Sequence, residues 1–263
     1  MLVLVVGGTG GLGRLVVREL GIRGHQVRVL SRQVRPETSF EPGVETARGD
    51  VATGQGLAEA VTGVQVVVDT VNAGRNADQV MVAGTQQLVR AAANAGVQHV
   101  IGIGIVGAEA IAPLVPYYRA KVAQEQVLSS GDVPWSWLRA TQFHDFVAQA
   151  VANLARLPVL PAPSILYQPV DRGEVAAALA DAVEAGPAGR VPDFAGPQTL
   201  PLVDLARIWL QARGRHQRAV TIPIPTRFGR RLREGALCNP DRAVGRTTFQ
   251  EWVNRQVRDG SHA

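Results

Sequence analysis

Cysteine and lysine are scarce in this chain of 263 residues. Cys238 is the only cysteine, which excludes an intrachain disulfide and a zinc site built from cysteines. No apolar run approaches the roughly 18 residues of a membrane span. Residues 2–6 are too short for a signal-peptide core and lack a basic flank. We therefore expect a soluble cytoplasmic protein without a membrane partner.

Lys121 is the only lysine among the 27 basic residues; the other 26 are arginine. Heavy use of Ala, Gly, Val, Arg and Pro indicates a composition that supplies arginine wherever any cation suffices. The lone lysine then predicts a place where a compact ammonium is needed rather than a planar guanidinium. Chance is the alternative explanation.

The net charge of +5 is concentrated near the C-terminus. Residues 1–206 hold 15 basic and 18 acidic residues, whereas residues 207–263 hold 12 arginines and 4 acidic residues. A helix-like stretch contains Arg227, Arg230, Arg231 and Arg233. These arginines could form a phosphate or polyanion site, but a solvated helix face is favoured. A protein that binds single-stranded nucleic acid needs several stacking aromatic residues, and here only Phe228 lies among the arginines. We therefore expect no nucleic-acid partner.

Continuous apolar segments alternate with segments of helical spacing along the first half of the chain. Strands are expected at 2–6, 27–30, 44–47, 64–71, 97–105 and 135–139, and helices at 11–20, 57–61, 76–95 and 118–129, with a polar loop at 31–43. This alternation is typical of a parallel sheet covered on both faces.

Regularity weakens after Phe143, where prolines interrupt the chain and helices are expected at 143–154 and 174–183. We predict an α/β fold: a Rossmann-like, doubly wound parallel sheet with a small C-terminal substrate lobe. Residues 1–142 form the dinucleotide-binding core. Residues 143–263 complete the sheet and form a lobe over its carboxyl edge, so that the whole is one compact unit.

A glycine-rich turn follows the first strand and opens the first helix. It reads Gly7-Gly8-Thr9-Gly10-Gly11-Leu12-Gly13. Glycine tightens such a turn and lets the backbone approach a pyrophosphate, which the free amides of the helix N-terminus attract. The context of strand, turn, helix and second strand is the one that a dinucleotide site requires. A glycine turn without a ligand is the alternative.

The end of the second strand favours NADP(H) over NAD(H). An NAD site usually places an acidic residue there to accept from the ribose hydroxyls. Here Ser31 and Arg32 follow the strand, with no acid before Glu37. Both side chains can bond a 2′-phosphate, and Arg14 could stack on or pair with the same group.

The chain resembles the atypical short-chain dehydrogenase/reductase superfamily, and within it the NmrA-like branch of NAD(P)H-binding proteins, which includes quinone-reductase-like members. The resemblance rests on the glycine motif at 7–13, on Gly49-Asp50-Val51, on Pro116-Tyr117-Tyr118-Arg119-Ala120-Lys121, and on Leu138-Arg139-Ala140-Thr141-Gln142-Phe143-His144. It covers most of the chain and is strongest over residues 1–150.

The resemblance implies roles for particular residues. Gly7, Gly10 and Gly13 match the phosphate-loop glycines, and Asp50 with Val51 matches the position that holds the adenine edge. The segment 70–74, which includes Thr70, Val71 and Asn72, would lie along the adenosine ribose and phosphates. The other candidates for cofactor binding around the turn are Thr9, Gly11, Leu12 and Arg14. Lys121 matches the lysine that bonds the nicotinamide ribose, and Tyr117 matches the catalytic acid.

The four-residue spacing of Tyr117 and Lys121 places both on one helix face. An ammonium beside the phenol would lower its pKa from about 10 and help it donate a proton. Packing at the helix start is the alternative for Tyr117, and the adjacent Tyr118 blurs the choice. Phe143 and His144 are candidates for the substrate pocket, although a helix-start histidine beside a capping acid explains His144 equally well.

One departure concerns Gly104, which stands where the superfamily has its catalytic Ser or Thr. Without that hydroxyl, ordinary alcohol and ketone chemistry is doubtful, while quinone reduction remains chemically feasible. The five histidines show no metal-ligand spacing, so no metal is expected; we expect His25 and His99 to be exposed loop residues.

Two functions remain open. The favoured one is an NADPH-dependent oxidoreductase that transfers hydride to a small apolar acceptor, such as a quinone or enone. The other is a non-catalytic NADP(H)-binding regulator of the NmrA type, with a protein partner. The pair Tyr117 and Lys121 favours the enzyme, whereas Gly104 and the basic C-terminal region favour the regulator.

Overall fold

The computed structural model describes residues 1–33, 40 and 43–260, which divide into two compact units. Unit 1 comprises Met1–Gly104, Val115–Leu138 and Val175–Pro192; unit 2 comprises Ile105–Leu114, Arg139–Glu174 and Asp193–Ala263. Each unit therefore draws on both halves of the sequence. The division at residue 142 stays a prediction.

A seven-stranded sheet is the centre of unit 1. Its strands are β1 (Leu2–Val6), β2 (Gln26–Ser31), β3 (Val44–Arg48), β4 (Val66–Asp69), β5 (His99–Ile105), β6 (Trp135–Ala140) and β9 (Gly189–Arg190), in the order β3-β2-β1-β4-β5-β6-β9. The order reverses direction beside β1, and the paired strands run parallel. The predicted Rossmann-like doubly wound sheet is confirmed.

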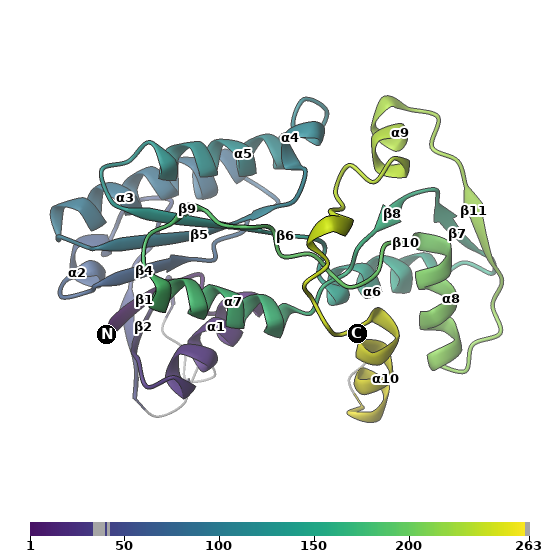
Figure 1. Cartoon of the computed structure of the whole chain (residues 1–263), viewed down its shortest axis with the longest axis horizontal. Helices are drawn as coiled ribbons and strands as arrows, with labels where there is room; N and C mark the ends of the chain where they lie inside the picture. The colour runs from purple at the N-terminus through teal and green to yellow at the C-terminus, as the bar shows by residue number, and fades with distance from the viewer. Residues whose placement is uncertain (34–39, 41–42, 261–263) are drawn as a thin grey trace. The chain divides into compact units, whose positions relative to one another are not determined.

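Helices cover both faces of this sheet (Figure 1). One face carries α1 (Gly11–Ile22) and α7 (Arg172–Ala185), joined where the Arg23 guanidinium bonds Asp181 and Glu184 at 2.7 and 3.1 Å. The other carries α2 (Leu57–Val61), α3 (Gly84–Asn94) and α5 (Pro116–Ser129). With helices on both sides, the central strands β1, β4 and β5 have no solvent-exposed positions, which explains their largely apolar sequences.

The core of unit 1 joins strand and helix side chains. Leu4, Val67 and Leu88 are completely buried in one cluster that also holds Trp137. Valine predominates in β1 and β4 because a branched side chain packs well on a pleated surface. Burial of this apolar surface is the main force that holds the unit together.

Unit 2 is built from helices and short strands. Its elements are α4 (Ala108–Ile111), α6 (His144–Leu154), β7 (Leu160–Pro163), β8 (Leu166–Tyr167), β10 (Leu200–Pro201), α8 (Leu202–Ala212), β11 (Ala219–Ile222), α9 (Arg227–Arg233), the 3₁₀ turn Pro240–Arg242 and α10 (Phe249–Arg258). Residues of α6, α8, α10 and β7 form its apolar core. A capping box at Thr248 and Glu251 starts α10.

Two elements of unit 1 differ from their predicted form. The apolar run 64–71 becomes a shorter strand, because β4 ends at Asp69. The predicted helix 76–95 is instead a π-helix (Asp78–Ala83) continued by α3. Most of the loop expected at 31–43 lies outside the described residues. Within the described chain, no helix has the length and apolarity needed to cross a membrane.

Candidate dinucleotide site

The glycine turn between β1 and α1 has the geometry of an anion cradle. Gly7 has φ +79°, and its carbonyl accepts from the Gly10 amide at 2.9 Å. A Cβ on Gly13 would lie 2.2 Å from that same carbonyl oxygen, so a side chain there is incompatible with the turn. No side chain caps α1 within the described structure, and its first amides are therefore available to a phosphate.

Thr70 joins this turn to the end of β4. Its hydroxyl donates to the Val6 carbonyl at 2.8 Å, and the position of a Cβ on Gly7 would lie 2.9 Å from the same hydroxyl oxygen. The carboxyl ends of two neighbouring parallel strands thus meet at one point, which is where ligands bind in open α/β sheets.

The residues predicted to contact adenosine follow β2 and β3. Arg32 is exposed and has no hydrogen bond or ion pair to any described residue. Ser31 Oγ donates to the Gln33 carbonyl at 2.7 Å, which stabilises the start of the loop. Asp50 Oδ1 accepts from the Ala52 amide at 2.9 Å, whereas the Val51 side chain is buried in the core and can meet a ligand through its backbone.

Arg14 also lies at this end of the sheet. Its Nε donates to the Thr9 carbonyl at 3.2 Å, and its guanidinium carbon lies 5.7 Å from the centroid of the Phe40 ring. The side chain is exposed and is held beside the glycine turn. A guanidinium in this place can reach a phosphate as a bidentate donor.

Tyr117 occupies the first turn of α5, after Pro116 at its start. Its hydroxyl donates to Asn72 Oδ1 at 2.9 Å, which links α5 to the segment after β4. Burial raises the pKa of Tyr117 above its ordinary value. This is the opposite of the lowering expected from Lys121, and the phenol stays protonated throughout the neutral range.

Lys121 lies in a buried polar network that the sequence did not reveal. Its Nζ donates to Gln124 Oε1 at 3.0 Å and to the carbonyls of Val71 and Ile103 at 3.3 and 3.4 Å. Gln124 Nε2 in turn donates to Asp69 Oδ2 at 3.1 Å, so the amide bridges the ammonium and the carboxylate. All three protons of the ammonium thus have acceptors inside the protein.

This network shifts the pKa values of both charged groups. Burial lowers the pKa of Lys121 to about 8, against the opposing effect of the Asp69 charge. Burial raises the pKa of Asp69, although the Val71 amide and Lys121 favour its carboxylate. Thr85 also donates to Asp69, at 3.1 Å. A buried charge needs such partners, and the compact ammonium suits three acceptors on three sides.

Trp137 explains the departure at Gly104. A Cβ on Gly104 would lie 2.4 Å from Trp137 Nε1, and one on Gly102 would lie 2.1 Å from Trp137 Cζ3. The indole thus fills the space above both glycines, and a serine at 104 has no room. The indole N–H is buried without a hydrogen-bond partner in the described structure.

The two predicted pocket residues belong to unit 2. His144 starts α6 and is 1% exposed; its Nε2 lies 3.0 Å from the Thr247 carbonyl, and its ring packs against Phe249 and Trp252. Burial lowers its pKa. This environment favours the structural alternative, a helix-start histidine. Phe143 is half-buried beneath the Arg172 guanidinium.

The expectation for His99 was wrong. Its ring is buried at the start of β5, its Nε2 lies 2.9 Å from Ser136 Oγ, and burial lowers its pKa to about 4. His25 is half-buried, with Nε2 3.3 Å from Glu184. Among the described residues no cluster of three metal-ligating side chains exists.

Asp69, Thr85, Gln124 and Trp137 were missed from the sequence. A single acid at the end of an apolar strand was a usable signal for Asp69, because a buried carboxylate demands a cation. Gln124, one turn after Lys121 on the same helix, was the corresponding signal for the bridge.

These features define a class of protein: an α/β protein of the Rossmann type, with an open glycine turn at the carboxyl edge of a parallel sheet. The turn fits a dinucleotide pyrophosphate, because a Cβ at Gly13 would strike the backbone and the helix amides are uncapped.

The chain belongs to the family described as NAD(P)H-binding, whose profile matches residues 7–185. The resemblance to the NmrA-like atypical short-chain dehydrogenase/reductases is thereby confirmed. Among curated relatives, the photosystem II assembly factor Ycf39 of Cyanophora paradoxa is 32% identical over 149 residues, 54% of this chain and 46% of that protein. The chain spans about half the length of the first such relatives.

Two further comparisons cover more of the chain. The (4-alkanoyl-5-oxo-2,5-dihydrofuran-3-yl)methyl phosphate reductase of Streptomyces griseus is 28% identical over 204 residues, 76% of this chain and 69% of that protein. The NADPH-dependent quinone oxidoreductase QOR2 of Escherichia coli, solved with NADPH, has a TM-score of 0.80 at 17% identity, covering 97% of this chain and 99% of that one. At this identity the structural match shows the fold alone.

Proposed function

We propose that this protein is an NADPH-dependent oxidoreductase that transfers hydride to a small apolar acceptor, such as a quinone or an enone. The uncapped glycine turn carries this proposal, because it offers main-chain amides to a pyrophosphate. The fold is shared with the quinone oxidoreductase, and the Streptomyces griseus relative is named as the reductase of an oxo-dihydrofuran, a conjugated carbonyl compound.

Preference for NADPH follows from Arg32. Its guanidinium is exposed and has no partner among the described residues. The sequence after β2 contains no acidic residue before Glu37. A charged hydrogen bond contributes about 1.5–3 kcal/mol, which corresponds to roughly a tenfold to hundredfold preference for the phosphorylated cofactor. Ser31 and Arg14 lie at the same edge of the sheet and would add to this preference.

The chain's own groups would bind and orient the cofactor and would protonate the reduced acceptor. The turn Gly7–Gly13 holds the phosphates, while Asp50, Thr70, Val71 and Asn72 flank the adenosine half. When bound, reduced nicotinamide supplies the hydride. Tyr117 holds a proton on its hydroxyl, because burial raises its pKa, and it can pass that proton to an oxyanion formed on the acceptor.

Lys121 would orient this region indirectly. With its ammonium bonded to the Val71 carbonyl and to Gln124, it positions the end of β4 against α5. Direct contact with a cofactor ribose, as the family resemblance implies, would require one of these bonds to be exchanged.

Two observations favour the alternative function, a redox-sensing regulator that binds NADP(H) without turnover. Trp137 fills the space that a side chain on Gly104 would need, and the three ammonium protons of Lys121 have acceptors inside the protein. A regulator of this kind would act on a protein partner.

Fluorescence titration with NADPH and NADH tests the cofactor assignment, with Arg32→Glu as the variant and Arg18→Glu as a control of equal charge change on the exposed part of α1. We expect wild type and Arg18→Glu to prefer NADPH at least tenfold and Arg32→Glu to lose that preference. An Arg32→Glu protein that still prefers NADPH would refute the assignment of Arg32 to the 2′-phosphate.

Oxidation of NADPH across a panel of quinones and enones separates the two functions. Turnover of any acceptor supports the enzyme. Tight NADPH binding without turnover of the whole panel supports the regulator.

A further inference from the structure

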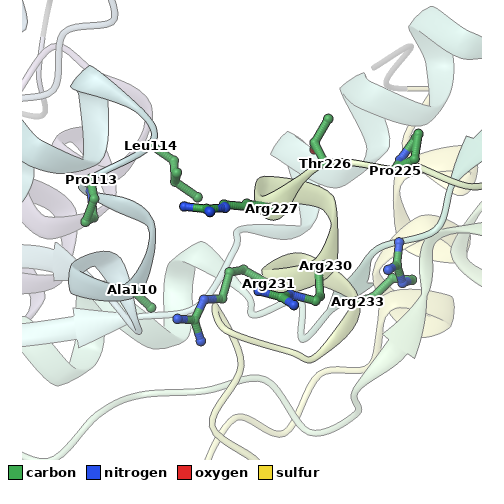
Figure 2. A pocket seen from close by; sticks show the side chains of 9 residues that line it. All are labelled: Ala110, Pro113, Leu114, Pro225, Thr226, Arg227, Arg230, Arg231 and Arg233. Atoms are coloured by element: carbon green, nitrogen blue, oxygen red, sulfur yellow. The ribbon is translucent and has the colours of Figure 1, made fainter.

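A cavity of about 610 Å³ in unit 2 lies outside the dinucleotide site (Figure 2). One wall is formed by α9, which supplies Arg227, Arg230 and Arg231. The facing wall comes from α4 and the turn after it, and its side chains are Ala110, Pro113 and Leu114. The cavity therefore has a cationic side and an apolar side.

The three arginines share one face of the helix, since they occupy positions i, i+3 and i+4. Each is exposed, and none of their side chains has a hydrogen bond or ion pair to a described residue. Figure 2 shows Arg227 reaching toward Leu114 and Arg231 reaching toward Ala110. Arg233 also lines the cavity, and its guanidinium donates to the Ile224 carbonyl at 3.2 Å.

The described lining of this cavity contains no acidic residue. Guanidinium groups gathered on one short helix repel one another, and some other arginines of this chain have carboxylate partners: Arg23 bonds Glu19, Asp181 and Glu184, and Arg207 bonds Asp204. An anion bound among the α9 arginines would reduce this repulsion.

The two walls are held against each other by backbone contacts. Gly107, just before α4, has φ +68°, and a Cβ there would lie 1.7 Å from the Ala236 carbonyl oxygen. A Cβ on Gly229 within α9 would lie 2.4 Å from the Ile224 carbonyl oxygen, and Thr226 caps the helix by accepting from the Gly229 amide at 3.0 Å. The arginines thus extend from a fixed frame, which reduces the entropy lost on binding.

We propose that this cavity binds a phosphate monoester of a small apolar molecule. Guanidinium groups bind phosphate through paired hydrogen bonds, and a monoester carries nearly two negative charges at neutral pH. The apolar wall of Ala110, Pro113 and Leu114 receives the hydrocarbon part of the ester. All residues that line the cavity belong to unit 2, so binding can be measured without turnover.

The test is calorimetric titration of the full chain with 1-naphthyl phosphate, with 1-naphthol as the uncharged comparison. The variant Arg227→Gln/Arg231→Gln removes two guanidiniums of the cavity. The control Arg255→Gln/Arg258→Gln removes two exposed arginines of α10 and changes the net charge equally. Circular dichroism and thermal unfolding establish that both variants are folded.

We expect the cavity variant to weaken binding of 1-naphthyl phosphate at least tenfold, the α10 control to leave it within twofold, and 1-naphthol to bind much more weakly than its phosphate. Equal loss in both double variants would show a general charge effect and would overturn the proposal. So would binding of a single-stranded oligonucleotide, with steep salt dependence, in place of the small ester.

Arg32→Glu distinguishes this cavity from the dinucleotide turn. Retention of 1-naphthyl phosphate binding by Arg32→Glu, with loss in the cavity variant, supports the proposal even where NADPH binding fails. Loss in Arg32→Glu with retention in the cavity variant places the phosphate at the turn and overturns it.

Kinetics then identify the source of the ester. If the phosphate belongs to the acceptor, the cavity variant raises KM for a phosphorylated enone and leaves KM for its unphosphorylated analogue unchanged. If the ester is an effector, 1-naphthyl phosphate changes the reduction of the unphosphorylated enone in wild type but not in the cavity variant. Either result supports the cavity as the binding site.

Discussion

Gly13→Ala is the sharpest test of the site, because the added methyl group has a known collision. The Cβ would lie 2.2 Å from the Gly7 carbonyl oxygen, 2.7 Å from Gly8 Cα and 2.8 Å from the Gly7 carbonyl carbon. All three atoms belong to the backbone of the turn, so no side chain can rotate away. The turn or the first helical turn of α1 must move by roughly an ångström to restore an ordinary contact.

The expected cost is about 1–3 kcal/mol of folding free energy, the range for overpacking in a packed region. For a chain of this size, 1 kcal/mol corresponds to roughly 2–4 °C in Tm, so a decrease of about 2–12 °C is expected. Movement of the turn also displaces the amides that face the phosphates. Loss of about 1.4 kcal/mol from those contacts weakens NADPH binding roughly tenfold.

Gly21→Ala is the matched control, in the same helix. A Cβ on Gly21 meets nothing within 4 Å, and replacing a helical glycine by alanine stabilises by about 0.5–1 kcal/mol. Thermal unfolding and NADPH fluorescence titration are run on both variants. Gly21→Ala should raise Tm slightly and bind normally; a Gly13→Ala protein with wild-type Tm and wild-type Kd would refute the proposed role of the turn.

Three further predictions concern the interior of unit 1. Lys121→Met leaves the buried Asp69 without its cation and should cost about 3–5 kcal/mol in denaturant unfolding. In the folded state the pKa of Lys121 is lowered from 10.5 to about 8, so between these pH values the unfolded state binds more protons than the folded state. The free energy of unfolding of the wild type should therefore rise by up to about 3 kcal/mol from pH 8 to 10.5. Lys121→Met should not show this rise. If the phenol of Tyr117 donates the proton, Tyr117→Phe should lower kcat roughly 10²–10⁴-fold with little change in KM. Because burial raises the pKa of Tyr117, wild-type activity should not fall through ionisation of the phenol below pH 10. Equal kcat values for wild type and Tyr117→Phe would exclude this proton-donating role. Gly104→Ser should destabilise the fold by about 1–3 kcal/mol, because Trp137 Nε1 lies 2.4 Å from the new Cβ, and should not increase turnover; a stable, more active variant would contradict this.

Local sequence predicted most strands and helices of the central sheet, but not the two-residue strand β9. Continuous apolar runs of β-branched residues predicted β1, β4 and β5, since a strand buried on both faces needs apolar side chains at every position. The spacing of apolar residues predicted α1, and glycines at fixed intervals predicted the turn before it. Each of these signals lies within about twenty consecutive residues.

The helix expected at 143–154 is confirmed as α6, but the short strands of unit 2 were not predicted, for a physical reason. Strands β8 and β10 have two residues each, which is too short for any periodicity. β7 pairs with β11, nearly sixty residues later in the chain. Such pairs form because of their tertiary partners rather than from local preference.

The chemistry of the site was likewise divided between sequence and fold. The residue types and spacings at the glycine turn, Arg32, Tyr117 and Lys121 predicted the ligand that we propose for this chain. Tertiary packing alone decided that Gln124 bridges Lys121 to Asp69, that Trp137 occupies the space above Gly104, and that the α9 arginines face an apolar wall from more than a hundred residues earlier. These outcomes depend on distances between residues far apart in the chain, and burial and distance set both the pKa of a group and the partners within its reach.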